Sequence, residues 1–196
     1  MNLGILGGSF NPVHLGHLIL AQEAKAALGL EKVLFIPCAL PPHKSQEDLL
    51  DAAHRLKMVA LAIEGDPSFE ACDIEIRRGG VSYSVETLRA LHQQMPSASF
   101  YFLIGSDALA GLSAWREIET LFRLCHFAVA ERPKFPLGPL PPGLLRFPMP
   151  EVAIASQEIR QRLRENRSVR YLVPEAVRDY LERNHLYRWK VSPSKP

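Results

Sequence analysis

Two histidines stand three residues apart near the beginning of the chain, and a glycine-rich turn precedes them. The turn is Gly7-Gly8-Ser9, and the apolar run Leu3–Leu6 before it has the character of a buried strand. A helical pattern begins at about Gly16, and a strand, a glycine turn and a helix together present backbone N–H groups to an anion. Residues three apart share one face of a helix, so His14 and His17 should both point toward that anion. Because imidazole donates hydrogen bonds in either protonation state, this stretch predicts a phosphate-binding site.

Two further polar segments each follow an apolar run that we expect to form a strand. The segment Pro41-Pro42-His43-Lys44 contains a lysine that could reach a phosphate as a point charge or lie in a solvated loop. The segment Gly105-Ser106-Asp107 contains an aspartate that could accept a hydrogen bond from a ribose hydroxyl or cap the next helix. Both interpretations stay open for each segment.

Three residues in the second half of the chain suit recognition of a nucleotide. Trp115 begins a helical turn after a break in the pattern, and a part-exposed indole there could stack on a heteroaromatic ring or belong to the core. Ser156 is expected to cap a helix, whose N-terminus would be a second anion site. Arg160 lies one turn further along, where its guanidinium fork would match phosphate oxygens. A helix-surface arginine is the alternative for Arg160.

Apolar runs alternate with helical patterns along the chain, and this alternation favours βαβ units with a parallel sheet. We expect strands at residues 3–6, 32–37, 69–76, 99–104, 126–130 and, as a short strand, 145–147. We expect helices at residues 16–28, 47–63, 84–94 (or from 82), 108–123, 156–165 and 174–184. Ligands of open parallel sheets bind beyond the carboxyl ends of the strands, and the polar segments described above fall at such ends.

These elements predict an α/β protein with a Rossmann-like open parallel sheet and helices on both faces. Residues 1–190 are expected to form a single domain, in which residues 151–190 are a small C-terminal helical part that carries the second anion site. Residues 132–150 hold seven of the sixteen prolines and should form a long surface loop around the short strand. Residues 191–196 should be a flexible tail.

The composition argues against several classes of protein. The chain has 196 residues, 47% of them hydrophobic, and a formal net charge of +2, which gives no basic excess for nucleic acid. It has no run of about 18 apolar residues and no evident signal peptide. Cys38, Cys72 and Cys125 are widely spaced, which is typical of reduced thiols and not of a disulfide set or a zinc site. We therefore expect a cytoplasmic protein that binds neither membrane nor nucleic acid.

The stretch from Gly7 to His17 reads Gly-Gly-Ser-Phe-Asn-Pro-x-His-x-Gly-His. It resembles the nucleotidyltransferase superfamily whose signature is His-x-Gly-His. The resemblance implies a Rossmann-like enzyme that moves a nucleotidyl group from a nucleoside triphosphate and holds the triphosphate with the turn and the two histidines. Asn11 departs from the pattern, because members of the superfamily often have aspartate before the proline.

A second motif of the superfamily, Ile-Ser-Ser-Thr-x-Ile-Arg, corresponds to residues 154–160 of this chain. The spacing holds, and the matching functional residues are Ser156, Ile159 and Arg160. Ala155 and Gln157 depart from the motif, and Gln157 replaces a hydroxyl that contacts the phosphates in the superfamily.

Three segments between the two motifs resemble bacterial nicotinate-nucleotide adenylyltransferases in particular, and the similarity spans almost the whole chain. They are Pro41-Pro42-His43-Lys44, Ser82–Leu88, and Gly105-Ser106-Asp107 followed by Trp115. The resemblance implies transfer of AMP from ATP to nicotinate mononucleotide, which gives nicotinate adenine dinucleotide and pyrophosphate in NAD biosynthesis. It also implies Mg²⁺ that is carried with ATP.

The resemblance further implies a role for each part of the site. The catalytic residues would be His14, His17 and Arg160. The residues that bind ATP would be Gly7, Gly8, Ser9, Phe10, His17, Gly105, Asp107, Ser156, Ile159 and Arg160. The residues that bind the pyridine nucleotide would be His43, Lys44, Tyr83, Ser84, Trp115 and Arg116. In this arrangement Trp115 stacks on the pyridine ring, and backbone amides near Ser84 and Arg116 hold its carboxylate. No residues are assigned to a dedicated metal site.

Other functions share these motifs. The acceptor could be nicotinamide mononucleotide or phosphopantetheine, although the Trp115 region and the Pro-Pro-His-Lys segment weigh against phosphopantetheine. A non-catalytic nucleotide sensor would keep the same fold, but the intact pair of His14 and His17 together with Arg160 argues against a sensor. The oligomeric state stays open, and a homo-oligomer is compatible with the sequence.

Overall fold

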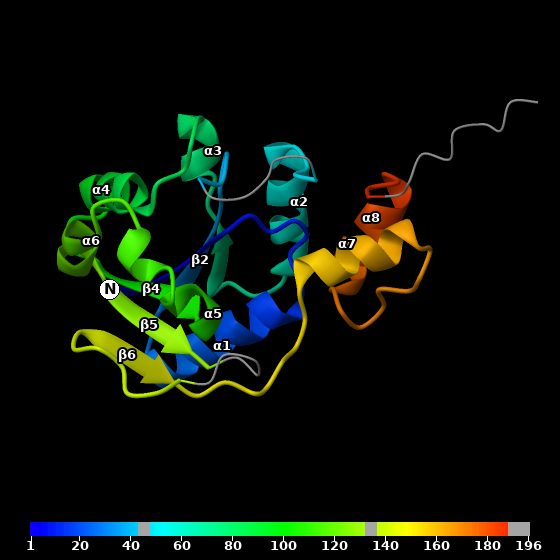
Figure 1. The fold of residues 1–196 in the computed structure, drawn as a ribbon. Helices are drawn as coiled ribbons and strands as arrows, with labels where there is room; N and C mark the ends of the chain where they lie inside the picture. The colour runs from blue at the N-terminus through cyan, green and yellow to red at the C-terminus, as the bar shows by residue number, and fades with distance from the viewer. Residues whose placement is uncertain (43–47, 132–136, 188–196) are drawn as a thin grey trace, which may run out of the picture.

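The computed structural model describes residues 1–42, 48–131 and 137–187, which contain a sheet of six parallel strands. The strand order is β3-β2-β1-β4-β5-β6 (Figure 1). The strands are β1 Asn2–Gly8, β2 Lys32–Pro37, β3 Phe69–Ala71, β4 Ser99–Gly105, β5 His126–Ala130 and β6 Leu144–Phe147. The expected open parallel sheet of a Rossmann-like α/β fold is therefore confirmed.

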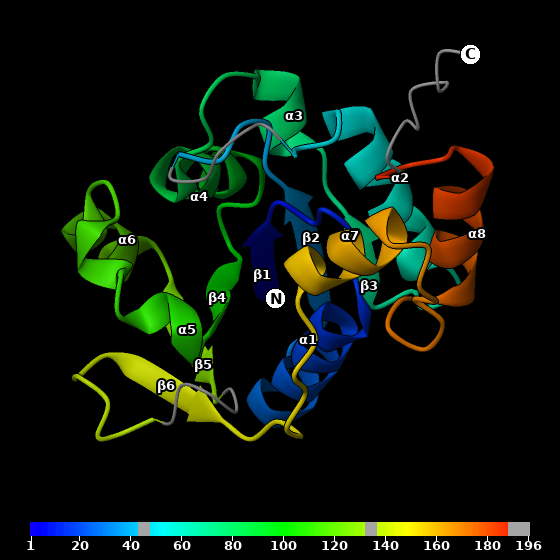
Figure 2. The ribbon, with the colours of Figure 1, turned by 45° about the vertical axis from the view of Figure 1, so that its right-hand side comes forward.

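Helices cover both faces of the sheet, which explains why its central strands are almost continuously apolar (Figure 2). The core on one face contains buried side chains of α1 Leu15–Leu28, α2 Ala52–Ala62, α7 Ser156–Arg164 and α8 Glu175–Arg183, and α8 packs on α2. The helices on the other face are α3 Ile74–Arg78, α4 Ser84–Gln94, α5 Ser106–Leu109 and α6 Ile118–Leu124, with the 3₁₀ turn η1 Leu112–Ala114. Each face thus has its own hydrophobic core.

The expected strand at residues 69–76 is wrong in its second half. The strand β3 ends at Ala71 and pairs only with β2, and the helix α3 begins at Ile74. Ile74 and Glu75 are adjacent and both buried, which a helix permits and an alternating half-exposed strand does not. The short helix ends at Gly79, whose φ of 71° disfavours other residues.

The expected helix at residues 47–63 begins later than predicted. The helix α2 begins at Ala52, because the preceding backbone at Asp48 and Leu50 is hydrogen-bonded to the side chain of Asn11 instead of forming a helical turn. The fully buried positions of α2 are Arg55, Met58 and Val59.

The remaining expectations hold with small changes. Gly29 caps α1 in the left-handed conformation and donates its N–H to the carbonyl oxygen of Lys25, which is typical of a glycine C-cap. The expected helix at 108–123 is divided into α5, η1 and α6, with Gly111 before η1 and Glu117 at a φ of 54° before α6. No helix among the described residues has the length and apolarity needed to cross a membrane. The expected tail at residues 191–196 lies outside the described residues.

Candidate active site

The candidate site lies at the carboxyl ends of β1 and β4, which are neighbours in the middle of the sheet. The strands β2 and β3, which follow β1 in sequence, lie on one side of β1, while β4, β5 and β6 lie on its other side. Such a topological switch point leaves a crevice beyond the strand ends, where ligands of open α/β sheets bind. The loop from Ser9 to His14 occupies this position and leads into α1.

The two predicted histidines stack against each other at the beginning of α1. Their ring centroids are 3.7 Å apart with an interplanar angle of 31°, and the ring of Phe10 lies edge-on to His17 at 5.0 Å. The backbone N–H of His14 donates to Nδ1 of His17 over 3.2 Å. In the neutral imidazole this acceptor role leaves the proton of His17 on Nε2, which makes that nitrogen a hydrogen-bond donor. The geometry therefore suits binding of an anion by His17.

Gly16 leaves room for the His14 ring. Gly16→Ala should lower kcat clearly while lowering the melting temperature only slightly. A Cβ at residue 16 would lie 3.0 Å from Nδ1 of His14, so the imidazole would have to shift by a few tenths of an ångström. Since a displacement of about 1 Å can cost about 10²-fold in rate, we expect kcat to fall by about tenfold. Kinetics and thermal unfolding of the same preparation test this. An unchanged kcat would show that the ring position does not matter.

The second sequence motif docks directly on the loop that carries the first. Nη1 of Arg160 donates to the carbonyl oxygen of Asn11 over 2.9 Å, and Oγ of Ser156 donates to the carbonyl oxygen of Pro12 over 2.9 Å. The prediction that Ser156 is the N-cap of this helix is therefore wrong. Ala155 is the N-cap and Ser156 is the first residue of α7, and the Ser156 hydroxyl bonds to the loop instead of to the helix backbone. Nε of Arg160 is buried and has no hydrogen-bond partner within the described part of the chain.

The Asn11 side chain, which departs from the superfamily pattern, joins three segments. Its Nδ2 donates to the carbonyl oxygen of Asp48 over 2.8 Å, and its Oδ1 accepts from the N–H of Leu50 over 3.1 Å and from the hydroxyl of Tyr187 over 2.5 Å. Burial raises the pKa of Tyr187 well above its ordinary value, so the phenol stays protonated and donates. A carboxylate could accept these bonds but could not donate to Asp48, which explains why an amide is suited to this position.

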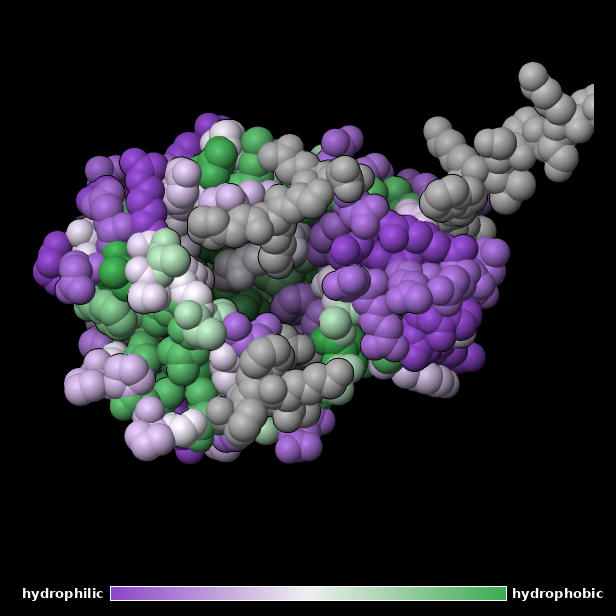
Figure 3. All heavy atoms as spheres, viewed as in Figure 1, coloured by the Kyte–Doolittle hydropathy of each residue, from purple (hydrophilic) through white to green (hydrophobic). Residues whose placement is uncertain are grey.

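A pocket of about 230 Å³ opens beside the histidine loop, between the carboxyl ends of β1 and β2 and the segment that precedes α4. Figure 3 shows the molecule hollowed in its middle, between the α4–α6 side and the hydrophilic surface of α7 and α8. The residues that line the pocket are Gly8, Ser9, Cys38, Pro41, Pro42, Ser82, Tyr83, Ser84, Trp115, Arg116 and Leu121. The pocket thus brings together all four of the described residues that were predicted to bind the pyridine nucleotide, namely Tyr83, Ser84, Trp115 and Arg116.

Trp115 satisfies both interpretations that its sequence context allowed. Its ring lies edge-on to Phe102 at 5.4 Å and to Phe127 at 6.0 Å, so one part of the indole packs on the core. Another part lines the pocket, where a flat ligand ring could stack. The core contacts hold the indole in one orientation.

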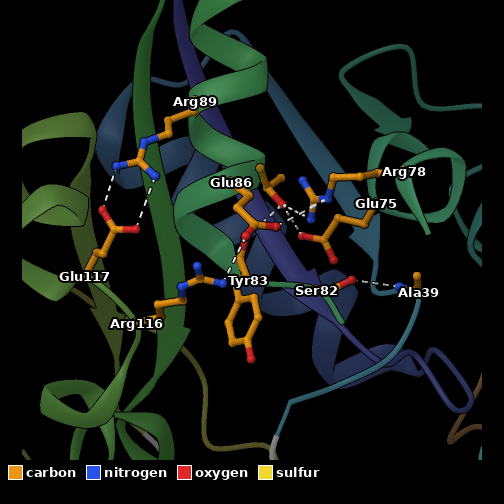
Figure 4. Close-up of polar contacts among 10 residues, drawn as sticks. Ala39, Glu75, Arg78, Ser82, Tyr83, Glu86, Arg89, Arg116 and Glu117 are labelled. Carbon is orange, nitrogen blue, oxygen red and sulfur yellow. Dashed lines mark hydrogen bonds and ion pairs between the residues drawn. The ribbon is translucent and has the colours of Figure 1, made fainter. Parts of the chain in front are cut away.

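Tyr83 and Arg116 form one wall of the pocket, and Figure 4 shows the side chains that contact Arg116. Nη1 of Arg116 contacts the carboxylate of Glu86 at 3.1 Å, and its guanidinium lies 4.5 Å from the centre of the Tyr83 ring. Arg78 also approaches Glu86, at 3.7 Å. The ion pairs and the aromatic stack hold the Arg116 side chain along the wall.

Behind this wall lies a buried carboxyl group, that of Glu75. The hydroxyl of Thr87 donates to Oε1 of Glu75 over 2.6 Å (Figure 4). Burial raises the pKa of Glu75, and the hydrogen bonds from Thr87 and Ser82 and the charges of Arg78 and Arg55 oppose that rise. The hydroxyl of Ser82 also accepts from the N–H of Ala39 over 2.9 Å, so the hydrogen-bonded network reaches the pocket lining.

Glu75→Gln should remove a pH dependence of stability that this carboxyl group creates. Because its pKa is raised in the folded protein, the folded state binds this proton more tightly than the unfolded chain. The stabilising contribution is fully present below the ordinary pKa of 4.5 and is lost as the pH rises through the raised pKa. Denaturant unfolding should show the free energy of unfolding of the unmodified protein falling relative to Glu75→Gln from pH 4.5 toward neutrality. If the difference in the free energy of unfolding between the two proteins did not change with pH, the raised pKa of Glu75 would be contradicted.

The remaining predicted residues occupy several places. Gly105 ends β4, and Asp107 is exposed in the first turn of α5, where Gly105 and not Asp107 is the N-cap. The side chains of Phe10 and Ile159 are buried in the core on the α1 face, where they support the loop and α7. His43 and Lys44 lie outside the described residues. No group of three or more histidine, cysteine, aspartate or glutamate side chains in the described ranges could hold a metal ion.

One residue near the site was not anticipated, and it is Arg55. This residue is 1% exposed, and its guanidinium donates to the carbonyl oxygens of Ser9, just after β1, and Ala39, just after β2. A sequence signal did exist, because an arginine three and four residues before Met58 and Val59 lies on their side of a helix.

Comparison with known proteins agrees with this architecture. Residues 5–162 match the model of the cytidylyltransferase-like family. The chain therefore belongs to the cytidylyltransferase-like family.

Relatives within this family point to one kind of enzyme. The chain is 42% identical over 197 residues to a probable nicotinate-nucleotide adenylyltransferase of Desulfitobacterium hafniense, with 95% of each chain covered. It is 43% identical over 188 residues to a probable nicotinate-nucleotide adenylyltransferase of Thermus thermophilus, with 96% of this chain and 100% of the relative covered. The resemblance to nicotinate-nucleotide adenylyltransferases is confirmed by these relatives.

Among solved structures, the fold is similar to that of Plasmodium falciparum nicotinic acid mononucleotide adenylyltransferase complexed with NaAD. The TM-score is 0.80 at 22% sequence identity, and the match covers 95% of this chain and 97% of that chain. This likeness concerns the fold.

Proposed function

We propose that the protein transfers AMP from ATP to nicotinate mononucleotide and releases nicotinate adenine dinucleotide and pyrophosphate. The observation that carries the proposal is that Gly8 and Ser9 line the Trp115 pocket and also lead directly into the loop that holds His14 and His17. Two substrates bound on either side of this turn would meet there. Relatives with 42% and 43% identity that carry the name of this activity support the same reaction.

The ATP side of the proposed site consists of the histidine loop and α7. Nε2 of His17 would donate to a phosphate oxygen, the His14 ring would pack beside it, and Arg160 would add a positive charge. The backbone of Gly7, Gly8 and Ser9 would approach the phosphates, as glycine turns permit. The other proposed contributors are Phe10, Gly105, Asp107, Ser156 and Ile159, with Asp107 accepting a ribose hydroxyl.

The acceptor side consists of the pocket and the segment after β2. The indole of Trp115 would stack on the pyridine ring, and backbone N–H groups near Ser84 and Arg116 would bind its carboxylate. The rigid wall formed by Tyr83 and Arg116 would limit movement of the ring. His43 and Lys44 are proposed to lie near the phosphate of the mononucleotide.

The substrate itself supplies the nucleophile in the proposed reaction. A phosphate oxygen of the mononucleotide forms a bond to the α-phosphorus of ATP, and the bond from that phosphorus to the oxygen bridging to the β-phosphate breaks. No protein nucleophile or general base is required, so the protein would contribute alignment and charge stabilisation from His14, His17 and Arg160. We propose that Mg²⁺ accompanies ATP and neutralises phosphate charge. Without an acidic cluster among the described residues, phosphate oxygens and water would provide most of its ligands.

Two wider features belong to the same proposal. Because α7 contacts the loop at Asn11 and Pro12, residues 1–190 would act as a single domain that includes the C-terminal helices. The cysteines of the described ranges, Cys38, Cys72 and Cys125, are not joined in disulfides with one another, which supports a reducing cytoplasmic location.

The test is pyrophosphate release with ATP and Mg²⁺, with nicotinate mononucleotide, nicotinamide mononucleotide and phosphopantetheine compared at equal concentration. We expect release with the acid to exceed release with the amide by a large factor. Similar release with both pyridine nucleotides would keep the reaction and remove the acid preference. Release only with phosphopantetheine would overturn the acceptor, and ATP binding without release with any acceptor would indicate a sensor.

A further inference from the structure

Arg55 continues the pairing of β1 and β2 beyond the end of their ladder. The last backbone hydrogen bond between the segments runs from the N–H of Cys38 to the carbonyl oxygen of Gly8, over 2.9 Å. One residue further along each segment, the guanidinium of Arg55 takes over. Its Nη1 donates to the carbonyl oxygen of Ser9 over 2.9 Å, and its Nη2 donates to that of Ala39 over 3.0 Å.

The guanidinium is itself held firmly. Its Nε donates to the carbonyl oxygen of Leu50 over 2.9 Å, just before α2, and Nη1 lies 3.8 Å from Sγ of Cys38. Arg55 is 1% exposed, and its hydrogen-bond partners in the described ranges are three backbone carbonyls and a thiol, with no carboxylate. Burying a charged side chain that has no directly bonded opposite charge costs free energy. A residue that only filled space in the core would not need this charge.

The two segments that Arg55 joins face the two substrates of the proposed reaction. Ser9 leads into the histidine loop, where the triphosphate would bind, and Cys38 lines the acceptor pocket. The N–H of Ala39 donates to the hydroxyl of Ser82, another pocket residue (Figure 4), so the hydrogen bonds that begin at Arg55 continue to the segment before α4. In-line transfer requires both reacting phosphates to be held at one separation.

We propose that Arg55 is a positioning residue, which sets the distance between the segment after β1 and the segment after β2 and so aligns the two substrates. The expected loss of kcat rests on the proposed function, whereas the effect of Arg55 on the distance between the two segments does not. The planar fork of arginine satisfies two carbonyls at once, whereas lysine presents a single ammonium group and glutamine a single amide.

The experiment compares Arg55→Lys and Arg55→Gln with the unmodified protein in steady-state kinetics. We expect kcat to fall by about 10²-fold in both variants while KM for each substrate changes by less than about fivefold, because misalignment by about 1 Å has effects of this size. Full activity in Arg55→Lys would show that charge and not fork geometry matters, and it would overturn the proposal.

A matched control separates positioning from loss of stability. Met58→Ala removes a fully buried side chain one turn along the same helix, which belongs to the hydrophobic core on that face of the sheet. It should lower the melting temperature yet keep kcat within about twofold when assayed well below that temperature. An equal loss of kcat in Met58→Ala and Arg55→Gln would overturn the positioning role.

Amide hydrogen exchange provides a readout that does not depend on activity. Peptides that span Ser9 and peptides that span Ala39 should both exchange faster in Arg55→Gln than in Met58→Ala. If no acceptor supports pyrophosphate release by the unmodified protein, the proposed function fails and the exchange result still decides the role of Arg55. Unchanged exchange in both peptides would overturn the inference.

Discussion

His17→Ala should lower kcat by about 10²–10³-fold, the cost of removing one donor that stabilises charge in a transition state. KM for ATP should rise by only a few-fold, because Arg160 and the glycine turn would remain to bind the triphosphate. The structural basis is the hydrogen bond from His14 N–H to Nδ1 of His17, which leaves Nε2 as the donor toward the phosphates. Steady-state kinetics with ATP and nicotinate mononucleotide measure both constants.

His126→Ala is the matched control for this measurement. His126 is exposed at the beginning of β5, which is the opposite edge of the sheet from the candidate site, and its loss should leave both constants unchanged. If His17→Ala lowers kcat and affinity for ATP by equal factors, then His17 binds the substrate equally in the ground state and the transition state. A kcat within twofold of the unmodified protein would remove His17 from the catalytic machinery.

Trp115→Ala should raise KM for nicotinate mononucleotide by about 10–100-fold, the range found when one aromatic ring that stacks on a base is removed. KM for ATP should stay nearly constant, because Trp115 lies in the pocket and not on the histidine loop. Kinetics in which each substrate is varied at saturation of the other will separate the two constants. Trp115→Phe retains an aromatic face and should lose less than Trp115→Ala.

Stability must be measured alongside, because the indole also packs against Phe102 and Phe127. Phe122→Ala is a suitable comparison, since that ring contacts Phe127 at 5.2 Å but is absent from the pocket lining. It should destabilise the protein without changing KM for the pyridine nucleotide. A rise in KM for ATP in Trp115→Ala, without a rise for the mononucleotide, would show that the stacking assignment is wrong.

Local patterns were sufficient for most of the sheet. The strands β2 and β5 begin and end where their apolar runs do, and α1 ends at a glycine, Gly29. These features depend on residues close in sequence, whose periodicity and caps are visible in the chain itself. The predicted range of β3 was too long. The residues from Ile74 onward alternate between apolar and polar as in a strand, but this short pattern is equally compatible with the helix that forms there.

The motifs of the candidate site could be read from the sequence, although the roles of their residues stay predictions. His14, His17 and Arg160 were identified from spacing and residue type, and the structure brings the loop of the two histidines into contact with Arg160. The pocket likewise gathers Ser84 and Trp115 from separate segments. That agreement arises because the carboxyl ends of parallel strands share one edge of a sheet, wherever they occur in the chain.

The sequence by itself determined the parallel α/β architecture, the glycine turn that precedes the two histidines and the class of chemistry, because each is encoded in short stretches, whereas phosphate binding by that turn stays a prediction. Only the tertiary structure decided which side chains support them. Arg55 bonds to Ser9 across 46 positions, and Tyr187 bonds to Asn11 across 176. Such bonds depend on how α2 and the C-terminal helices pack, and no local pattern contains that information. The roles of Arg55 and Asn11 can be recognised only after folding has brought their distant hydrogen-bond partners next to them.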